Sequence, residues 1–194
     1  MNDATPPLPD RVGVAFKEWA GIVSALADGR QTLILRKGGI AEGAGGFVPE
    51  HPYFWLYPTH VHQAEQGLRP TGADLDPESS PTGTVPLRAL AVVETIHFVD
   101  RPERLDALED LHLWSAETVA KRFHYKRPGL WVLGVRVHAR SEPIALAVTP
   151  EHAGCKTWVP LDPPLATDGL APVLDEPEYA RLMNRLREAL TLDG

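Results

Sequence analysis

The strongest fold signal in the chain is Asp28-Gly29-Arg30-Gln31-Thr32-Leu33-Ile34-Leu35-Arg36-Lys37-Gly38-Gly39, a helix stop followed by an apolar strand and a cationic glycine turn. Upstream of it, large apolar residues recur at helical spacing and predict an amphipathic helix from about Asp10 to Ala27. Gly29 sets its end, because glycine tolerates the left-handed conformation that closes a helix. The apolar residues of this expected helix are Val12, Phe16, Trp19, Val23 and Leu26.

Two cations at the end of this strand are followed by a glycine turn, a combination that is typical of an anion-binding site. Arg36 offers a planar fork of donors, and Lys37 offers a point charge. Gly38 and Gly39 allow backbone N–H groups to approach a ligand closely. The turn therefore predicts a phosphate or carboxylate site, with solvated cations at an ordinary hairpin end as the alternative.

The composition favours one α+β domain with many turns. The chain has 194 residues, 43% of them hydrophobic, with 19 prolines and 16 glycines, which suits strands and turns better than a helical bundle. We expect a flexible leader over 1–9, one domain over 10–165 with a mobile loop at 67–84, and a docked C-terminal helix over 175–194. With no membrane-spanning apolar run, no signal-peptide core and a lone Cys155, a cytoplasmic location is expected.

Local patterns predict the remaining elements. Thr59 and Ser115 are expected to cap helices, and Pro102 to occupy the first turn of another. Ser141-Glu142-Pro143 is expected to form a turn between two strands. The segments expected to form a curved, mainly antiparallel sheet or a small barrel are 31–37, 52–57, 85–99, 130–139, 144–149 and 157–161.

The charge distribution is uneven along the chain. The formal net charge of −7 opposes indiscriminate binding to nucleic acid or to anionic membranes. Residues 118–141 nevertheless contain no Asp or Glu, which predicts a local basic face on an acidic protein. The cations in this window are Lys121, Arg122, Lys126, Arg127, Arg136 and Arg140, with His124 and His138 as titratable additions.

Aromatic residues interleave with cations in 123–131 and crowd together in 53–57. Such a composition can stack nucleobases while cations hold phosphates, and it can equally form core. Strand alternation would bury Phe54 and leave Trp55 and Tyr57 on the opposite side. The exposure of these rings decides between the two interpretations.

Metal and nucleophile chemistry find little support in the sequence. His60 and His62 point about 200° apart on a helix, and only a strand aligns both rings, so no metal site or cofactor is expected. Cys155 has a neighbouring lysine that can activate a thiol, but a lone cysteine before a strand is more often a small buried residue. The glycines of 38–46 match neither the dinucleotide-binding nor the Walker spacing.

Four motifs follow one another in the chain: Lys17-Glu18-Trp19, Leu35-Arg36-Lys37-Gly38-Gly39, Leu56-Tyr57-Pro58-Thr59-x-x-His62-Gln63 and Gly154-Cys155-Lys156-x-Trp158. As a set, over about residues 10 to 161, they resemble a bacterial domain-of-unknown-function family, DUF1802. The spacing Gly29-x-Gln31-x-x-x-x-Arg36 is also similar, more distantly, to the Gly-x-Lys-x-x-x-x-Arg signature of ASCH domains in the PUA-like superfamily.

The ASCH similarity implies a small β-barrel with flanking helices and a cleft that binds RNA or a modified nucleoside. Gln31 stands where the signature has lysine, and Ile34 stands where amidohydrolase members have threonine. The binding role therefore transfers more readily than the catalytic one, and Arg36 is the matched residue.

The expected function is a nucleic-acid or nucleotide-binding module that has a basic, aromatic-lined cleft and prefers single strands. An exposed aromatic ring would stack a base while the cations hold phosphate. The residues expected to bind the nucleic acid or anion are Arg36, Lys37, Gly38, Gly39, Thr59, His62, Gln63, Lys121, Arg122, Lys126, Arg127, Trp131 and Lys156.

Two other classes stay open. A hydrolase or nuclease acting on nucleic acid would use Glu18 or Glu42 as base and Lys17 or Lys37 as electrostatic stabiliser, although the chain lacks the Glu-x-Lys of restriction-endonuclease-like sites. A protein-interaction domain without a ligand is the third class. Lys17, Glu18, Arg36 and Lys37 are expected around one pocket, with Glu18 either serving as a base or paired with a cation.

Overall fold

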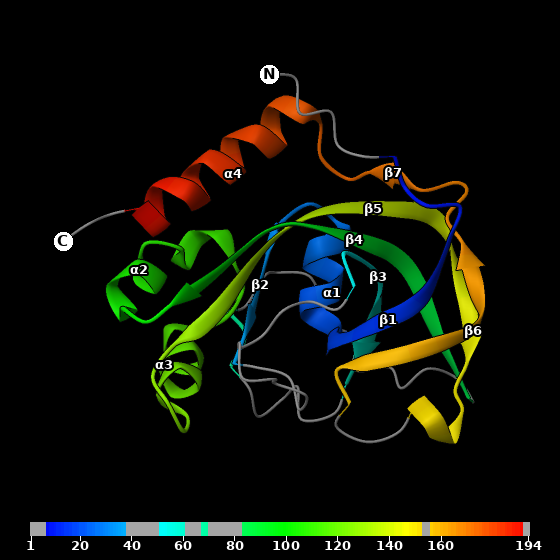
Figure 1. Ribbon diagram of the computed structural model, residues 1–194, viewed down its shortest axis with the longest axis horizontal. Coiled ribbons are helices and arrows are strands. Elements are labelled where there is room, and N and C mark those ends of the chain that lie inside the picture. The colour runs from blue at the N-terminus through cyan, green and yellow to red at the C-terminus, as the bar shows by residue number, and fades with distance from the viewer. Residues whose placement is uncertain (1–6, 38–50, 61–66, 70–82, 153–155, 192–194) are drawn as a thin grey trace.

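The computed structural model describes residues 7–37, 51–60, 67–69, 83–152 and 156–191 (Figure 1). Within these residues the α-helices are α1 (Ala20–Ala27), α2 (Pro102–Asp106), α3 (Ala116–His124) and α4 (Glu176–Thr191). The strands are β1 (Arg11–Trp19), β2 (Leu33–Arg36), β3 (Tyr53–Thr59), β4 (Thr84–Val99), β5 (Leu130–Ala147), β6 (Trp158–Ala166) and β7 (Ala171–Pro172). Two short 3₁₀ turns are η2 (Glu109–Leu111) and η3 (Pro150–His152).

The seven strands form one mixed sheet in the order β2-β5-β4-β3-β1-β6, with β7 added to β5. β1 and β3 pair in parallel, and every other pair is antiparallel. Figure 1 shows β4 and β5 as long arcs that curve around α1, while α4 lies across their outer side. The expected α+β fold with a curved, mainly antiparallel sheet is confirmed. In the described part of the chain the sheet is not closed into a barrel, because β2 and β6 end the strand order without pairing.

Residues 11–19 form a strand, which corrects the expected helix from Asp10 to Ala27. β1 lies between β3 and β6, so neighbours on both edges satisfy its backbone. Val12, Val14 and Phe16 repeat every second residue and are buried. This short run fits part of a helical spacing as well as a strand, and only the long-range pairing selects the strand. Helix α1 then starts at Ala20.

Residues 130–147 form one continuous strand, so the turn expected at Ser141-Glu142-Pro143 is wrong. β5 stays paired with β4 on both sides of this point, where Leu87 faces Ile144 and Ala89 faces Ala139. The shift in register between these pairs is a bulge in β5. The polar and proline residues that suggested a reversal mark this bulge instead.

The helix termini around the sheet largely follow the sequence signals. Pro102 begins α2, and Ser115 caps α3 by accepting a hydrogen bond from the Thr118 N–H at 3.2 Å. Thr59 is the last residue of β3, and the helix that it was expected to cap falls on residues that the structure does not describe. Residues 61–66 lie outside the described residues, as do 1–6 of the expected leader and 70–82 of the expected loop.

Helix α4 docks on the sheet through its apolar face. Tyr179, Met183, Leu186 and Leu190 are buried, and the helix packs against β5 and α2. Among the described helices, none combines the length and apolar character needed to cross a membrane.

Candidate functional site

A buried ion pair joins the end of β1 to the end of β2. Glu18 is 2% exposed, and its Oε2 lies 3.4 Å from Nη1 of Arg36. The other carboxylate oxygen accepts the Trp19 N–H at 2.9 Å. Nη2 of Arg36 donates to Oγ1 of Thr157 at 3.0 Å, and the guanidinium lies 4.5 Å from the Phe16 ring centroid. Both members of the pair therefore have partners inside the protein.

Arg122 brings a second guanidinium to the same place. It stacks over the rings of Trp114 at 3.9 Å and Trp19 at 4.5 Å, and these two rings lie 4.2 Å apart. Burial lowers the pKa of Arg122 to about 10, while the charge of Glu18 raises it and that of Arg36 lowers it. We call Glu18, Arg36, Arg122, Trp19 and Trp114 the arginine corner.

Lys17 and Glu18 are consecutive in a strand and therefore point to opposite faces of the sheet. Nζ of Lys17 donates to the His152 carbonyl and lies 5.6 Å from the Tyr57 ring centroid. Of the four residues expected around one pocket, the structure joins Glu18 and Arg36, while Lys17 and Lys37 reach different neighbours.

Lys37 connects the end of β2 to the segment that follows α3. Its Nζ donates to the carbonyls of Phe123 at 2.7 Å, Gly129 at 2.9 Å and Arg127. An ammonium group has three hydrogens, so these bonds account for its donors. Lys37 therefore holds the backbone of 123–129 in place.

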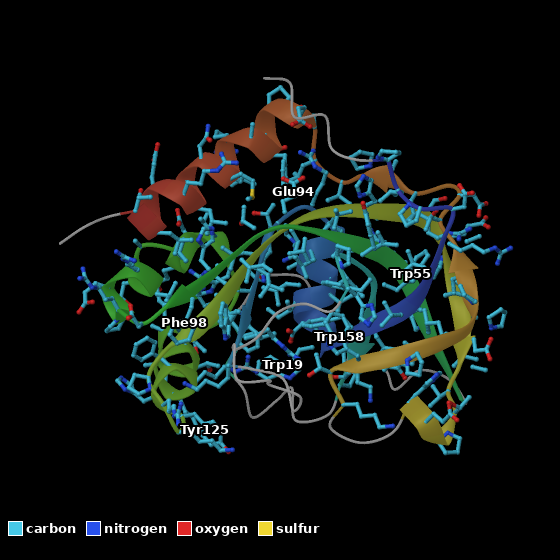
Figure 2. All side chains as sticks on the ribbon, viewed as in Figure 1. Trp19, Trp55, Glu94, Phe98, Tyr125 and Trp158 are labelled. Atoms are coloured by element: carbon cyan, nitrogen blue, oxygen red, sulfur yellow. The ribbon has the colours of Figure 1, made fainter. Side chains whose placement is uncertain are left out.

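The residues that Lys37 holds carry the exposed cations of the acid-free window. We call the exposed residues, Lys121 and 124–128, the basic turn. Its exposed side chains include Tyr125, which is 59% exposed and points away from the end of α3 (Figure 2). Lys126 has a φ of 60°, in the left-handed region. The exposed cationic and titratable residues of the basic turn are Lys121, His124, Lys126 and Arg127.

Arg136, another cation of the window, is buried and paired. Nε of Arg136 donates to Glu94 at 2.8 Å, and its Nη1 donates to Glu176 at 2.7 Å. Figure 2 labels Glu94 beneath α4. The guanidinium also lies 3.8 Å from the Tyr179 ring centroid. Arg136 therefore links β4 and β5 to α4 and is not part of the basic turn.

The burial of the aromatic run of β3 decides for the core interpretation of these rings over the base-stacking one. Trp55 is 0% exposed and Tyr57 is 6% exposed. β3 pairs along both edges with β1 and β4, and the consecutive residues 54–57 are all buried, so both of its faces are covered. The Phe54 ring lies 4.9 Å from Phe16, which places it in the same core.

An exposed aromatic residue that sequence reasoning missed lies at the end of β4. Phe98 is 49% exposed and its ring lies 5.0 Å from that of Trp131, which is half-buried (Figure 2). Phe98 faces Trp131 directly across the β4–β5 ladder. The signal was present, because Glu94, Ile96 and Phe98 alternate outward along the expected strand.

The remaining predicted residues are scattered. Thr59 is half-buried and pairs in register with Trp19, and Lys156 is exposed with Nζ 3.4 Å from the Glu151 carbonyl. Among the residues that the structure describes, no three His, Cys, Asp or Glu side chains gather as a metal site would require. The predicted residues outside the described ranges are Gly38, Gly39, Glu42, His62 and Gln63, together with Cys155.

Gln31 has a structural role at the position where ASCH domains carry lysine. It is 1% exposed, its Nε2 donates to the Leu33 carbonyl at 2.6 Å, and its Oε1 accepts the Leu113 N–H at 3.1 Å. The side chain therefore ties β2 to the segment before α3.

Comparison with solved structures finds ASCH proteins, the group that the sequence resembles. The crystal structure of ASCH from Zymomonas mobilis has 14% identity and a TM-score of 0.44, and covers 88% of this chain and 93% of its own. A serine-to-alanine mutant of the Zymomonas mobilis protein has 15% identity and a TM-score of 0.43, and covers 91% of this chain and 98% of its own. None of the curated proteins matches. The model of the family described as "Domain of unknown function (DUF1802)" matches residues 15–185, so the chain belongs to the DUF1802 family.

Proposed function

We propose that the chain binds nucleic acid, with a preference for single strands, through phosphate contacts to the basic turn. The observation that carries this proposal is that Lys121, Lys126 and Arg127 are exposed within a segment that contains no acidic residue. Exposed lysine and arginine side chains are the usual phosphate ligands of nucleic-acid-binding proteins.

The geometry of the basic turn supports the proposal. Lys37 bonds the carbonyls of Phe123, Arg127 and Gly129, which lie within and beside the turn, so the cations of the turn project from a backbone that is already ordered. An ordered backbone lowers the entropy lost when a ligand binds. Lys126 also keeps an unfavourable left-handed conformation, and strained backbone of this kind clusters at functional sites.

The negative net charge of the chain and the pairing of Arg36 both favour the basic turn as the place where a polyanion binds. The net charge of −7 repels polyanions from most of the surface. In the arginine corner, Arg36 is engaged by Glu18 and Thr157. The exposed cations of the turn, rather than the first cations of the expected anion site, are therefore the phosphate ligands.

The hydrolase alternative gains no comparable support. Lys17 and Glu18 point to opposite faces, and the Glu18 carboxylate already accepts the Trp19 N–H and pairs with Arg36. A base held in this way is not free to take a proton from a bound substrate.

Fluorescence anisotropy with labelled single-stranded and duplex RNA and DNA tests the proposal at several salt concentrations. For the wild type we expect the logarithm of the affinity for single strands to fall with the logarithm of salt, by about 0.7 per phosphate contact. The double variant Lys126→Ala/Arg127→Ala should bind more weakly and should have a shallower slope.

A matched control removes two positive charges far from the basic turn. Arg181 and Arg187 are exposed on α4, which lies on the outer side of the sheet, away from α3 (Figure 1). Arg181→Ala/Arg187→Ala should keep the wild-type slope. Equal losses in the two double variants, or no wild-type binding at low salt, would refute the proposal, and the latter would leave a protein-interaction domain.

A further inference from the structure

The exposed ring of Phe98 is held rigidly from two sides. Trp131 supports it across the strand pair, with ring centroids 5.0 Å apart and planes inclined by 56°. The tip of the ring rests on Gly129, where a Cβ atom would lie 2.3 Å from the Phe98 Cζ. Gly129 also has a φ of +122°, which L residues rarely adopt. Glycine at this position therefore makes room for the ring.

The same glycine connects Phe98 to the basic turn. The carbonyls of Gly129 and Arg127 both accept hydrogen bonds from Nζ of Lys37. Two oxygens bonded to one nitrogen lie within about 6 Å of each other. The ring and the cations thus belong to one ordered unit, and a single strand can contact both.

Phe98 suits base stacking better than the other exposed ring. Tyr125 is more exposed, but its ring neighbour is the side chain of Lys126, with Nζ 5.4 Å from the ring centroid. A lysine stem is flexible and fixes a ring poorly. Phe98 packs instead on backbone and on a second aromatic ring, so little conformational entropy remains to be lost on binding.

We infer that Phe98 is a stacking platform for one unpaired nucleobase of the single strand whose phosphates bind the basic turn. The inference rests on the proposed function and adds the residue that reads the base. Stacking on a phenyl ring accepts any base, so the ligand class is single-stranded nucleic acid with little sequence preference. Bases paired within a duplex do not offer a free face, which accounts for the expected preference for single strands.

The test compares two labelled strands of about ten nucleotides, one with bases and one abasic, by fluorescence anisotropy. Phe98→Leu keeps an apolar contact with Trp131 and Gly129 but has no π face. It should bind the strand with bases about 5- to 150-fold more weakly than the wild type does, with an unchanged salt slope. Its affinity for the abasic strand should stay at the wild-type value. Phe98→Trp should bind the strand with bases at least as tightly as the wild type.

Thermal melting of each variant confirms that the fold is kept, and Tyr125→Ala is the matched aromatic control. If Phe98→Leu keeps wild-type affinity while Lys126→Ala/Arg127→Ala loses it, the platform is wrong and the proposed function stands. If Tyr125→Ala alone loses affinity for bases, or if the wild type binds both strands equally, the platform is also wrong. Failure of the wild type to bind either strand overturns both proposals.

Discussion

The arginine corner and the basic turn contain the same kinds of cation in opposite environments. In the corner, Arg36 and Arg122 lie beside a carboxylate that is 2% exposed, and they stack on aromatic rings. In the turn, Lys126 and Arg127 project into solvent from a segment without acids. The neighbours of a cation, rather than its residue type, decide whether it stabilises the fold or remains available to a ligand.

Lys37 links these two regions. It follows Arg36 in sequence, yet it bonds to carbonyls of the basic turn while Arg36 bonds into the corner. Adjacent residues thus serve different regions, because consecutive strand residues point to opposite faces. Substitutions in the two regions should therefore separate stability from binding.

The largest effect is expected for Glu18→Gln. The amide keeps an acceptor for the Trp19 N–H but removes the negative charge beside Arg36 and Arg122. Leaving these half-buried cations without their buried countercharge should lower the free energy of unfolding by about 3 to 5 kcal/mol, measured by urea denaturation. At a temperature where the variant is folded, its affinity for single strands should equal that of the wild type.

Glu178→Gln is the control for this substitution. Glu178 and Arg181 form an exposed pair at 3.6 Å on α4, and its loss should change stability by less than about 1 kcal/mol. Similar costs for the two variants would show that the corner is no more protected than the surface. Lost binding with unchanged stability in Glu18→Gln would move the binding site to the corner.

The next effect concerns His112, which lies beside the corner in sequence, before Trp114. Its ring is 2% exposed, and its Nδ1 accepts the Trp114 N–H at 3.2 Å. Burial, and then the charge of Arg69, lowers the pKa of His112 from 6.5 to about 4. The unfolded chain therefore takes up a proton at a higher pH than the folded protein does.

This shift fixes the sign and the pH window. The contribution of neutral His112 to stability is complete above pH 6.5 and is lost as the pH falls from 6.5 toward about 4. The loss should reach about 3 kcal/mol at most. His112→Asn supplies an acceptor in place of Nδ1 and does not titrate, so its stability should fall less over this window in urea denaturation. Equal pH dependence in both proteins would contradict the assignment.

The sequence predicts most local structure but not which cations meet. The apolar run of β4, the proline of α2 and the Ser115 cap carry local signals that survive in the fold. The prediction for β1 fails, because Val12 and Phe16 fit a helix together with Trp19 and fit a strand together with Val14, and only the pairing with β3 and β6 decides between them. The same error explains why Lys17 and Glu18 were expected at one pocket, since consecutive residues point to opposite faces in a strand but not in a helix.

Long-range contacts explain the other differences at the site. Lys37 and Gly129 are distant in sequence, and no local pattern signals that one side chain bonds the other's carbonyl. Phe98 could have been found, since its outward alternation with Glu94 and Ile96 is local. Its support by Gly129, in contrast, depends on the close approach of β4 to the end of the turn.

A smaller effect is expected for Lys37→Met, which keeps the apolar stem and removes the ammonium. The carbonyls of Gly129 and Arg127 lose this donor, which should cost about 2 kcal/mol in urea denaturation. The affinity for single strands should fall because the turn loosens, but the salt slope should not change. Lys156→Met, at an exposed lysine, should cost less than about 0.5 kcal/mol. A salt slope reduced by about 0.7 in Lys37→Met would make Lys37 a phosphate ligand instead.

The smallest effect on stability is expected for Lys126→Gly, and it has the opposite sign. Lys126 has a φ of 60°, which costs an L residue about 1 kcal/mol and costs glycine almost nothing. The greater entropy of glycine in the unfolded chain offsets part of this gain, so stability should rise by up to about 1 kcal/mol. The loss of one cation should weaken single-strand binding and reduce the salt slope by about 0.7.

Arg127→Gly is the control, because it removes the same charge without relieving a left-handed residue. It should reduce the salt slope equally and lower the melting temperature. If Lys126→Gly were less stable than the wild type, the left-handed conformation would not be a source of strain. If its slope were unchanged, Lys126 would not contact phosphate, and the contrast between a structural corner and a binding turn would rest on Arg127 and Lys121.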